Sequence, residues 1–226
     1  RQTFADDILE GLAVPAAGPI APWHAYYDGD LPIPAYDNSE AETLLIEAGY
    51  EPGVNPLALS LLAPIDPSSS YVPALWLQTQ LGEVGVNVTV TYPTTRDAYW
   101  AALQAGDYDL ALATWAGDQD PDSWTYGLLH SQGAWGFALS GDDTAETDGL
   151  LTAARPMGDP AERGELYDQV QGLSAEGPPL IYLTSDRHIT ARWLEWEPGQ
   201  ALNVPASLTG MRSVGAVVAQ SPLLYG

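Results

Sequence analysis

Hydrophobic residues in the middle of the chain follow two alternating patterns. In some segments every second residue is apolar, which is typical of a strand with one buried face. In others the apolar residues recur every three or four positions, which is typical of an amphipathic helix. The patterns predict, in chain order, a helix over 37–48, a strand over 57–61, a helix over 72–79, a strand over 86–92, a helix through 99–103 and a strand over 108–114. Helices and strands that alternate over short connections favour a layered α/β lobe.

Local signals mark where several helices begin. Asp37 is followed three residues later by Glu40, and Thr94 is followed by Asp97, so each pair predicts a capping box. The segment 159–173 opens with an aspartate, a proline and a glutamate, which together predict the start of another helix.

The remaining segments are less regular. Residues 4–12 predict a short helix, and residues 15–34, with five prolines, predict an extended surface loop. A helix over 145–154 and a strand over 180–184 are also expected. Beyond residue 196 prolines and glycines interrupt the pattern, and it predicts no element there.

The charge of the chain narrows the classes of partner. Acidic residues number 30 and basic residues 7, all of them arginine, so the formal net charge is -23 at pH 7. A field of this sign repels phosphates, and we therefore expect neither nucleic acid nor an anionic membrane surface as a partner. Lysine-free, aspartate-rich surfaces favour solubility in concentrated salt, so salt adaptation is a further hypothesis. The chain has no cysteine, which excludes disulfides and thiolate chemistry.

The segment 115–121 carries the clearest candidate chemistry. It follows a predicted strand directly, and polar residues at a strand end of an α/β lobe are where ligands tend to bind. The carboxylates of Asp118 and Asp120 could accept hydrogen bonds from an ammonium group or from sugar hydroxyls. Alternatively, either aspartate could cap a helix that begins near Pro121.

Three tryptophans bracket the same segment, and their rings could stack on a sugar or pack against a peptide side chain. These are Trp115, Trp124 and Trp135. Core packing is the alternative for each. It is favoured for Trp124, which lies on an expected helix, whereas a surface or cleft position is favoured for Trp135, which lies in a glycine-flanked loop.

Six groups of short motifs follow one another along nearly the whole chain. They are Gly11-Leu12-Ala13 with Gly18-Pro19-Ile20; Tyr36-Asp37 with ETLLIEAGY over 42–50; Leu81-Gly82-Glu83-Val84-Gly85-Val86; Gly106-Asp107-Tyr108-Asp109; Trp115-Ala116-Gly117-Asp118 with Asp120-Pro121-Asp122; and Asp159-Pro160-Ala161-Glu162-Arg163 before Pro178-Pro179-Leu180. Their order resembles the C-terminal half of the family 5 extracellular solute-binding proteins, the peptide, nickel and oligosaccharide receptors of bacterial ABC importers.

The resemblance implies a fold and a domain organisation. It implies the second lobe of a type II periplasmic-binding-protein-like fold, a layered α/β lobe with a mixed sheet. Residues 1–35 would form a hinge-proximal helix and an extended proline-rich loop, residues 36–196 the ligand-binding lobe, and residues 197–226 a tail. The tail would return toward an N-terminal lobe that is missing from this fragment. The intact protein would act in the periplasm or outside the cell, with or without a lipid anchor, and deliver its ligand to membrane permease subunits.

The resemblance also implies roles for individual residues. In peptide-binding members the acid at the position of Asp118 pairs with the amino terminus of the peptide. Arg96 and Tyr99 fall where many members have an aromatic residue followed three positions later by tyrosine, and that aromatic residue often lines the pocket. Arginine replaces the aromatic residue here, and 63–70 lacks the arginine with which dipeptide-binding members hold a carboxylate. Both departures argue against a dipeptide ligand.

We therefore expect a binding protein without catalytic activity, cofactor or metal, which captures a peptide or an oligosaccharide between two closing lobes. A nickel chelate, an opine or another small solute is the alternative within the family. A secreted carbohydrate-active enzyme or carbohydrate-binding module is the alternative of another class, because Asp118 and Asp120 could act across a glycosidic bond. The chain lacks the short motifs of serine hydrolases, phosphate-binding loops and zinc proteases, and His24, His130 and His188 are scattered singly.

Overall fold

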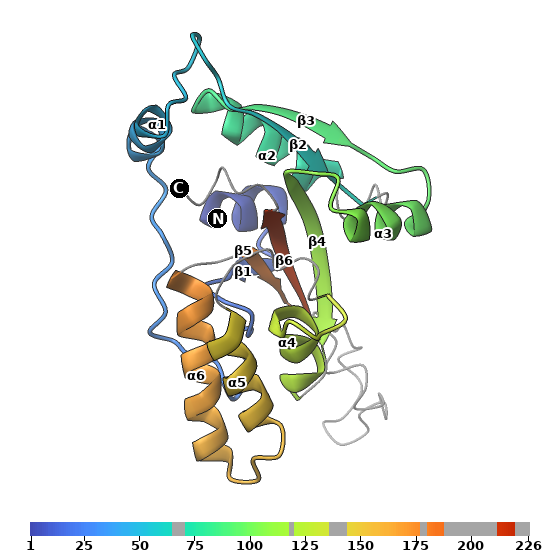
Figure 1. Cartoon of the computed structure of the whole chain (residues 1–226). Helices are drawn as coiled ribbons and strands as arrows, with labels where there is room; N and C mark the ends of the chain where they lie inside the picture. Colours follow the sequence, from blue (N-terminus) through green and yellow to red (C-terminus); the bar gives the residue numbers. More distant parts are fainter. Residues whose placement is uncertain (65–70, 118–119, 136–143, 177–179, 188–211, 220–226) are drawn as a thin grey trace, which may run out of the picture.

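A mixed sheet runs through the part of the chain that the computed structural model describes, namely residues 1–64, 71–117, 120–135, 144–176, 180–187 and 212–219. Its 6 strands lie in the order β1-β5-β6-β4-β2-β3 (Figure 1). The strands are β1 (Ala13–Pro15), β2 (Ala58–Leu62), β3 (Asn87–Thr91), β4 (Leu110–Gly117), β5 (Leu180–Asp186) and β6 (Arg212–Ala219). The helices are the π-helix η1 (Phe4–Ile8), α1 (Asn38–Glu47), α2 (Tyr71–Glu83), α3 (Arg96–Ala105), α4 (Asp122–Leu129), α5 (Thr144–Ala154) and α6 (Pro160–Glu176).

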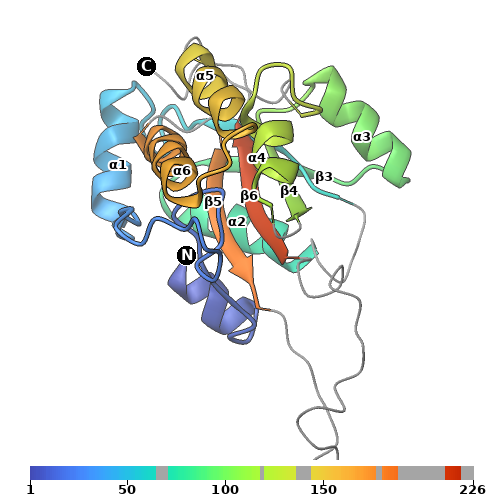
Figure 2. The same ribbon diagram turned by 90° about the horizontal axis from the view of Figure 1, so that it is seen from below.

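Two parallel crossovers build the half of the sheet that carries the candidate chemistry. Strand β2 lies between β3 and β4 and is parallel to both. The chain passes from β2 to β3 through α2 and then returns past β2 to β4 through α3. Because crossovers of one hand that run in opposite directions place their helices on opposite faces, α2 and α3 lie on different sides of the sheet (Figure 2).

The other half of the sheet is antiparallel. Strand β6 lies between β4 and β5 and is antiparallel to both, whereas β1 is an edge strand antiparallel to β5. The sequence predicted no element where β6 lies, because Gly215 interrupts its short apolar run.

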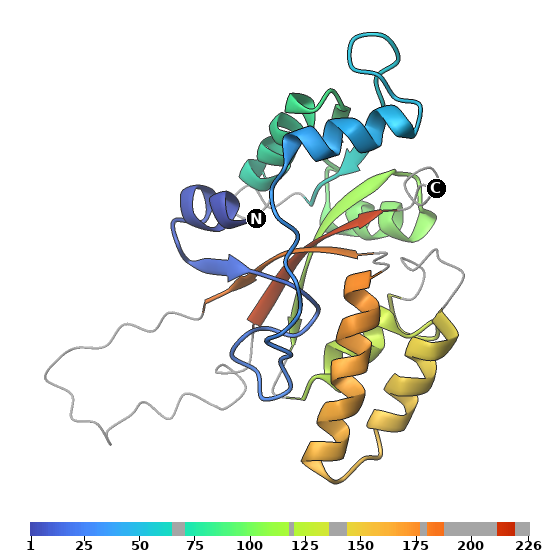
Figure 3. The same cartoon turned by 90° about the vertical axis from the view of Figure 1, so that its left-hand side faces the viewer.

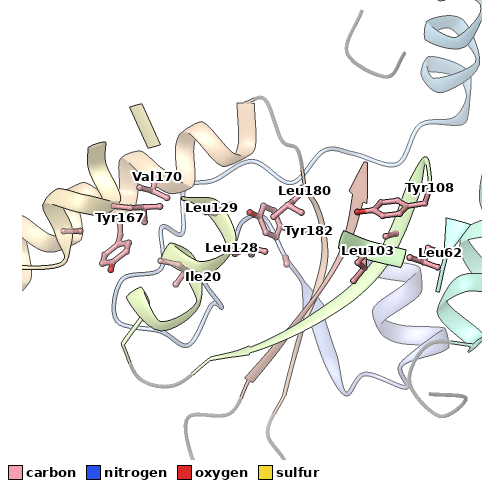
Figure 4. Packing of buried hydrophobic residues seen from close by; sticks show 14 of the residues in the cluster. Ile20, Leu62, Leu103, Tyr108, Leu128, Leu129, Tyr167, Val170, Leu180 and Tyr182 are labelled. Atoms are coloured by element: carbon pink, nitrogen blue, oxygen red, sulfur yellow. The ribbon is translucent and has the colours of Figure 1, made fainter. Parts of the chain in front are cut away.

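The first hydrophobic core lies between the sheet and helices α3 to α6. Its buried residues include Ile20, Leu62, Leu103, Leu128, Leu129, Tyr167, Val170, Leu180 and Tyr182 (Figure 4). Ile20 belongs to the proline-rich segment that was expected to be a surface loop. That expectation is wrong for residues 16–21, which are buried. Their small and apolar side chains fit beneath the helices.

The second hydrophobic core lies on the opposite face, beneath α2. It contains Leu59 and Leu61 of β2, Val88 of β3, Leu112 of β4 and Ala74 of α2. Helix α1 borders this layer through partly buried residues, but none of its own residues is fully buried (Figure 3). The second core is therefore covered less completely than the first.

The two predicted capping boxes have different outcomes. Asp37 caps α1 as predicted, because its side chain accepts a hydrogen bond from the Glu40 amide at 3.0 Å. The prediction of Thr94 as the second cap is wrong by one residue. Thr95 caps α3 instead, and its hydroxyl accepts a hydrogen bond from the Ala98 amide at 3.1 Å.

The helix predicted over 4–12 is also shorter than expected. It is the π-helix η1, which ends at Ile8, and Glu10 and Gly11 follow it with φ angles of 52° and 72°. Such angles are incompatible with a continuing right-handed helix, and they turn the chain into β1.

Candidate functional site

The direction of the crossovers reverses between β2 and β4. Helix α2, which follows β2, packs against the second core, whereas α4, which follows β4, packs against the first. In open α/β sheets, ligands bind outside the carboxyl ends of two neighbouring strands whose helices diverge in this way. The ends of β2 at Leu62 and of β4 at Gly117 therefore mark the candidate site.

Trp115 lies two residues before the end of β4. Its ring is half-buried and packs against the first core. The indole Nε1 is buried and has no hydrogen-bond partner among the residues that the structure describes. Buried donors without a partner are rare, so this atom marks a place where a further group is expected. Asp118, the acid predicted to contact a ligand, lies outside the described residues.

Asp120 is held by two neighbouring elements. Its Oδ1 accepts a hydrogen bond from the Asp122 amide at 3.0 Å, which supports the capping role considered for it. Both carboxylate oxygens also accept hydrogen bonds from the Arg163 guanidinium, at 2.7 and 3.3 Å. The Asp120 side chain is 54% exposed, whereas that of Arg163 is only 14% exposed.

The pKa of Asp120 reflects these contacts. Partial burial opposes its ionisation, but the hydrogen bonds from Arg163 and from the Asp122 amide, with the positive charge of Arg163, outweigh burial. Together they hold the pKa of the Asp120 carboxyl below its ordinary value. The carboxylate therefore stays ionised at neutral pH and serves as the anionic half of this ion pair.

Arg163 is anchored at further points within the first core. Its Nε donates to the Ala154 carbonyl at 3.0 Å, and Nη2 lies 3.3 Å from the hydroxyl of the buried Tyr167. The sequence motif that contains Arg163 contributed to the family resemblance, but sequence reasoning gave this residue no role. A conspicuous arginine in a chain with only 7 basic residues was the signal that could have found it.

Trp124 is half-buried and connects α4 to the proline-rich segment. Its indole Nε1 donates to the Pro19 carbonyl at 3.0 Å, and the ring of His24 meets it edge-on at 5.6 Å. These contacts fasten the buried proline-rich segment to α4. Trp124 therefore links α4 to residues around Pro19, which are distant in the sequence.

Trp135 is half-buried and packs on Trp100 of α3, with ring centroids 4.5 Å apart. Its backbone amide donates to the Gly127 carbonyl at 2.8 Å. The tight turn before it requires glycine, because a Cβ on Gly133 would lie 2.4 Å from the carbonyl oxygen of Tyr126. The partly exposed Trp100 and Trp135 rings form an aromatic pair against the first core.

The structure separates Arg96 and Tyr99, although both lie on α3. Arg96 is the exposed first residue of the helix. Tyr99 is 3% exposed, and its hydroxyl donates to the Leu112 carbonyl at 2.9 Å. Burial, with a smaller effect of Tyr108, raises the pKa of Tyr99 above its ordinary value. Of the two, only Arg96 offers its polar group to solvent.

A hollow of about 560 Å³ lies on the opposite face of the sheet, and its walls come from η1, the start of α2, β1, β4 and β5. The lining residues are Phe4, Ile8, Leu9, Glu10, Leu12, Ala13, Val72, Pro73, Leu112, Thr114, Leu183, Thr184, Asp186 and Arg187. Leu12 and Val72 are 50% and 52% exposed, so the hollow presents apolar surface to solvent. Sequence reasoning did not find it.

The described residues contain neither a metal-binding cluster nor a membrane-spanning helix. No cluster of three or more histidine, aspartate or glutamate side chains there could hold a metal ion. No helix in the same residues is long and apolar enough to cross a bilayer.

The fold and the strand-end site define a class. They are those of a type II periplasmic-binding-protein-like lobe with a mixed α/β sheet, as predicted. The family described as bacterial extracellular solute-binding proteins, family 5 Middle, matches residues 1–136. The chain belongs to this family, and the resemblance found in the sequence is confirmed.

Curated relatives in this family bind peptides. The chain is 32% identical over 197 residues to Di/tripeptide-binding protein 4 of Pseudomonas aeruginosa, covering 80% of this chain and 34% of that protein. It is 26% identical over 201 residues to the glutathione-binding protein GsiB of Salmonella typhimurium, covering 84% of this chain and 38% of that protein. The chain thus spans little more than a third of the length of these relatives.

Solved structures share the fold. One is the periplasmic binding protein DppA of Helicobacter pylori in complex with the peptide STSA, with a TM-score of 0.68 and 21% identity, over 96% of this chain and 37% of that one. Another is NikZ of Campylobacter jejuni in complex with Ni(L-His), with a TM-score of 0.69 and 20% identity, over 96% and 40% of the two chains. The fold is therefore shared by proteins with different ligands.

Proposed function

We propose that this chain is a ligand-binding lobe of the substrate-binding component of an ABC importer. It captures a peptide or an oligosaccharide against a second lobe, and closure of the two lobes around the ligand is the mechanism. The observation that carries the proposal is the reversal of the crossovers between β2 and β4, because ligands of such sheets bind at the carboxyl ends of these strands. Binding and release, without chemical conversion, are the expected activity.

A peptide is the favoured ligand class. The curated relatives are named for dipeptides, tripeptides and glutathione. Asp118 follows the end of β4 in the sequence, where a carboxylate could pair with the ammonium group of a peptide. Trp115 would line the same site from near the end of β4, and the Trp100–Trp135 pair would border it. Arg96 would offer a positive charge to a ligand carboxylate, whereas Asp120, Trp124 and Tyr99 would act by supporting the site.

A second lobe of the intact protein is the main partner. The hollow beside η1 and the exposed Leu12 and Val72 leave apolar surface that a lobe of the same protein could cover. The matched part of this chain covers only 34% of the first of these relatives, which leaves room for such a lobe. Residues 1–35 and 197–226 are proposed to connect to it, and residues 36–196 to carry the ligand.

The remaining partners follow from the family. We place the intact protein in the periplasm or outside the cell, where it would deliver its ligand to the membrane permease subunits of an ABC transporter. A lipid anchor on the outer face of the cytoplasmic membrane fits the same role.

Ligand-dependent stabilisation tests the proposal. The melting temperature of the intact protein that contains this chain is measured with tri-L-alanine and with maltotriose, for the unchanged sequence, Asp118→Asn and the control Asp97→Asn. Asp97 is an exposed acid on α3. A ligand at a hundred times its Kd stabilises the folded state by about 2.7 kcal/mol. We expect tri-L-alanine to stabilise the unchanged chain and Asp97→Asn, and to stabilise Asp118→Asn much less.

One result would contradict the binding function, and two others would change the ligand class or the site. Hydrolysis of maltotriose would favour the carbohydrate-active enzyme, and stabilisation by maltotriose without turnover would move the ligand class from peptides to oligosaccharides. Equal stabilisation of Asp118→Asn and of the control would remove the carboxylate from the site.

A further inference from the structure

The turn that follows β4 is held by an arginine from a helix far along the chain. Arg163 of α6 lies 43 residues from Asp120 in the sequence and donates to both of its carboxylate oxygens, at 2.7 and 3.3 Å. Such two-bond contacts between guanidinium and carboxylate groups fix orientation as well as distance. The turn is therefore attached to α6 and not only to its neighbours in the chain.

Arg163 is itself fixed at its other contacts. Its Nε donates to the Ala154 carbonyl at the end of α5, and Nη2 lies 3.3 Å from the Tyr167 hydroxyl. Tyr167 is fully buried, and the Arg163 side chain is only 14% exposed. A side chain held at several points loses little further freedom when it binds the carboxylate. It can therefore set the position of the turn.

We propose that Arg163 is a positioning residue for ligand binding: by holding Asp120 it fixes the turn 120–122 beside the strand end where the ligand binds. This inference rests on the proposed function, because it assumes a ligand at the carboxyl end of β4. Asp120 and Asp122 carry like charges two residues apart in a highly acidic chain, and Arg163 and Arg155 each bring a positive charge to one of them. Binding groups must be held to within about half an ångström of their working geometry by the residues that support them.

A neighbouring ion pair provides a matched control. Arg155 contacts Asp122 of the same turn through a single Nε–Oδ2 contact of 3.2 Å, and its side chain is 48% exposed. Its guanidinium lies over the Tyr126 ring at 4.0 Å. Arg155→Met thus removes one arginine that contacts the same turn, but it leaves the two-bond contact between Arg163 and Asp120 in place.

The first arm of the test needs no ligand. Hydrogen exchange is measured by NMR in the 226-residue chain at two amides that side chains cap: Asp122, bound to Asp120 Oδ1, and Ala98, bound to Thr95 Oγ1. We expect Arg163→Met to speed exchange at Asp122 by about tenfold and at Ala98 by less than about twofold, because local opening raises exchange only where it occurs. Arg155→Met should change both by less than about twofold.

A second variant covers the case in which Arg163→Met does not fold. Asp120→Asn keeps an oxygen that can accept from the Asp122 amide but removes the charge that Arg163 holds. We expect exchange at Asp122 to rise by about threefold, again without a change at Ala98. Equal acceleration at both amides, or none at Asp122 in the folded variants, would overturn the positioning role.

The second arm measures, by titration calorimetry, the affinity for tri-L-alanine of the intact protein that contains this chain. We expect Arg163→Met to weaken binding by about tenfold and Arg155→Met by less than about twofold, since a misplaced binding group loses affinity on this scale. Equal affinity of Arg163→Met and the unchanged chain would overturn the role in binding. If the unchanged chain did not bind tri-L-alanine while the exchange result held, the peptide function would be wrong for this probe and Arg163 would still position the turn.

Discussion

The two faces of the sheet are covered differently, and we call the face of α3 to α6 the closed face and the face of α2 and η1 the open face. On the face of α3 to α6, polar contacts complete the hydrophobic packing: Trp124 holds the Pro19 carbonyl, Gln171 holds the Tyr26 carbonyl, and Arg163 joins α5, α6 and the turn after β4. On the face of α2 and η1, a hollow remains, and apolar residues on its walls are about half exposed.

The comparison separates stability from association. The polar contacts just named hold one arrangement of the closed face, because breaking any of them leaves a donor or acceptor unsatisfied. A face with exposed apolar surface and an open hollow is typical of an interaction surface. The candidate ligand site at the ends of β2 and β4 lies where the two faces meet, so a closed face could support it while the open face receives a partner.

A truncated side chain in the first core should lower the free energy of unfolding far more than one on the exposed surface of α2. Leu151 of α5 is fully buried in the first core, whereas Leu75 of α2 is 48% exposed. Leu151→Ala should lower the free energy of unfolding by about 3 kcal/mol, because it removes buried methyl groups and leaves a cavity. Leu75→Ala should lower it by less than about 1 kcal/mol. Urea unfolding of both variants measures the difference, and equal losses would show that Leu151 is no more tightly packed than an exposed leucine.

A second prediction tests the polar contacts of the closed face. Gln171 is fully buried, donates to the Tyr26 carbonyl at 2.9 Å and accepts from the Asp28 amide at 3.3 Å. Gln171→Leu should lower the free energy of unfolding by about 2 kcal/mol, because it leaves these backbone groups unsatisfied. Gln169→Leu is the control, since Gln169 is exposed on the same helix and bonds only within it. If both variants lost the same stability, Gln171 would not hold the proline-rich segment.

Much of the fold could be predicted from the sequence, because apolar residues recur every second position in strands and every three or four positions in helices. Helix α1 and strands β2, β3 and β4 follow such patterns, and Asp37 caps α1 through a contact three residues away. What could not be predicted depends on contacts between distant residues. The burial of Ile20 needs helices from much later in the chain, and β6 is a strand only because β4 and β5 flank it.

The candidate site divides in the same way. The strand before the site could be predicted, but it was expected to end at Thr114 and runs on to Gly117, so Trp115 lies within β4 and not after it. The burial of Tyr99 and the capture of Asp120 by Arg163 could not, because both depend on tertiary packing. The hollow beside η1 was invisible for the same reason, since five separate elements form its walls.

The exposed apolar residues of the hollow should bind hydrophobic molecules. The double variant Leu12→Gln with Val72→Gln removes two half-exposed apolar side chains from the hollow. It should reduce the binding of a hydrophobic dye, while the free energy of unfolding changes by about 1 kcal/mol or less. Val54→Gln is the control, because Val54 is 75% exposed and does not line the hollow. Unchanged dye fluorescence in the double variant would show that the hollow is not an accessible apolar surface.

Asp120 and Asp168 should contribute to stability with opposite signs, by small amounts that depend on pH. The pKa of Asp120 is lowered because Arg163 and the Asp122 amide outweigh burial, whereas burial, with the charges of Asp28 and Glu165, raises the pKa of Asp168. A lowered folded-state pKa stabilises the fold above the unfolded-state pKa, and this contribution is lost as the pH falls through the folded-state value. A raised pKa has the opposite sign, since the ionised group costs stability at neutral pH and protonation relieves that cost.

Asp120→Asn should therefore destabilise the chain at pH 7, and Asp168→Asn should stabilise it. Each change should be about 0.5 kcal/mol or less, because both side chains are largely exposed and solvent screens their interactions. The Asp168 difference should be close to zero near pH 3, because a carboxyl with a raised pKa is protonated there, whereas part of the Asp120 difference should remain, because its lowered pKa keeps it ionised to lower pH. Urea unfolding at the two pH values measures them. A common sign for the two variants at pH 7 would mean that the net charge of the chain, and not the local contacts of each acid, sets their contribution.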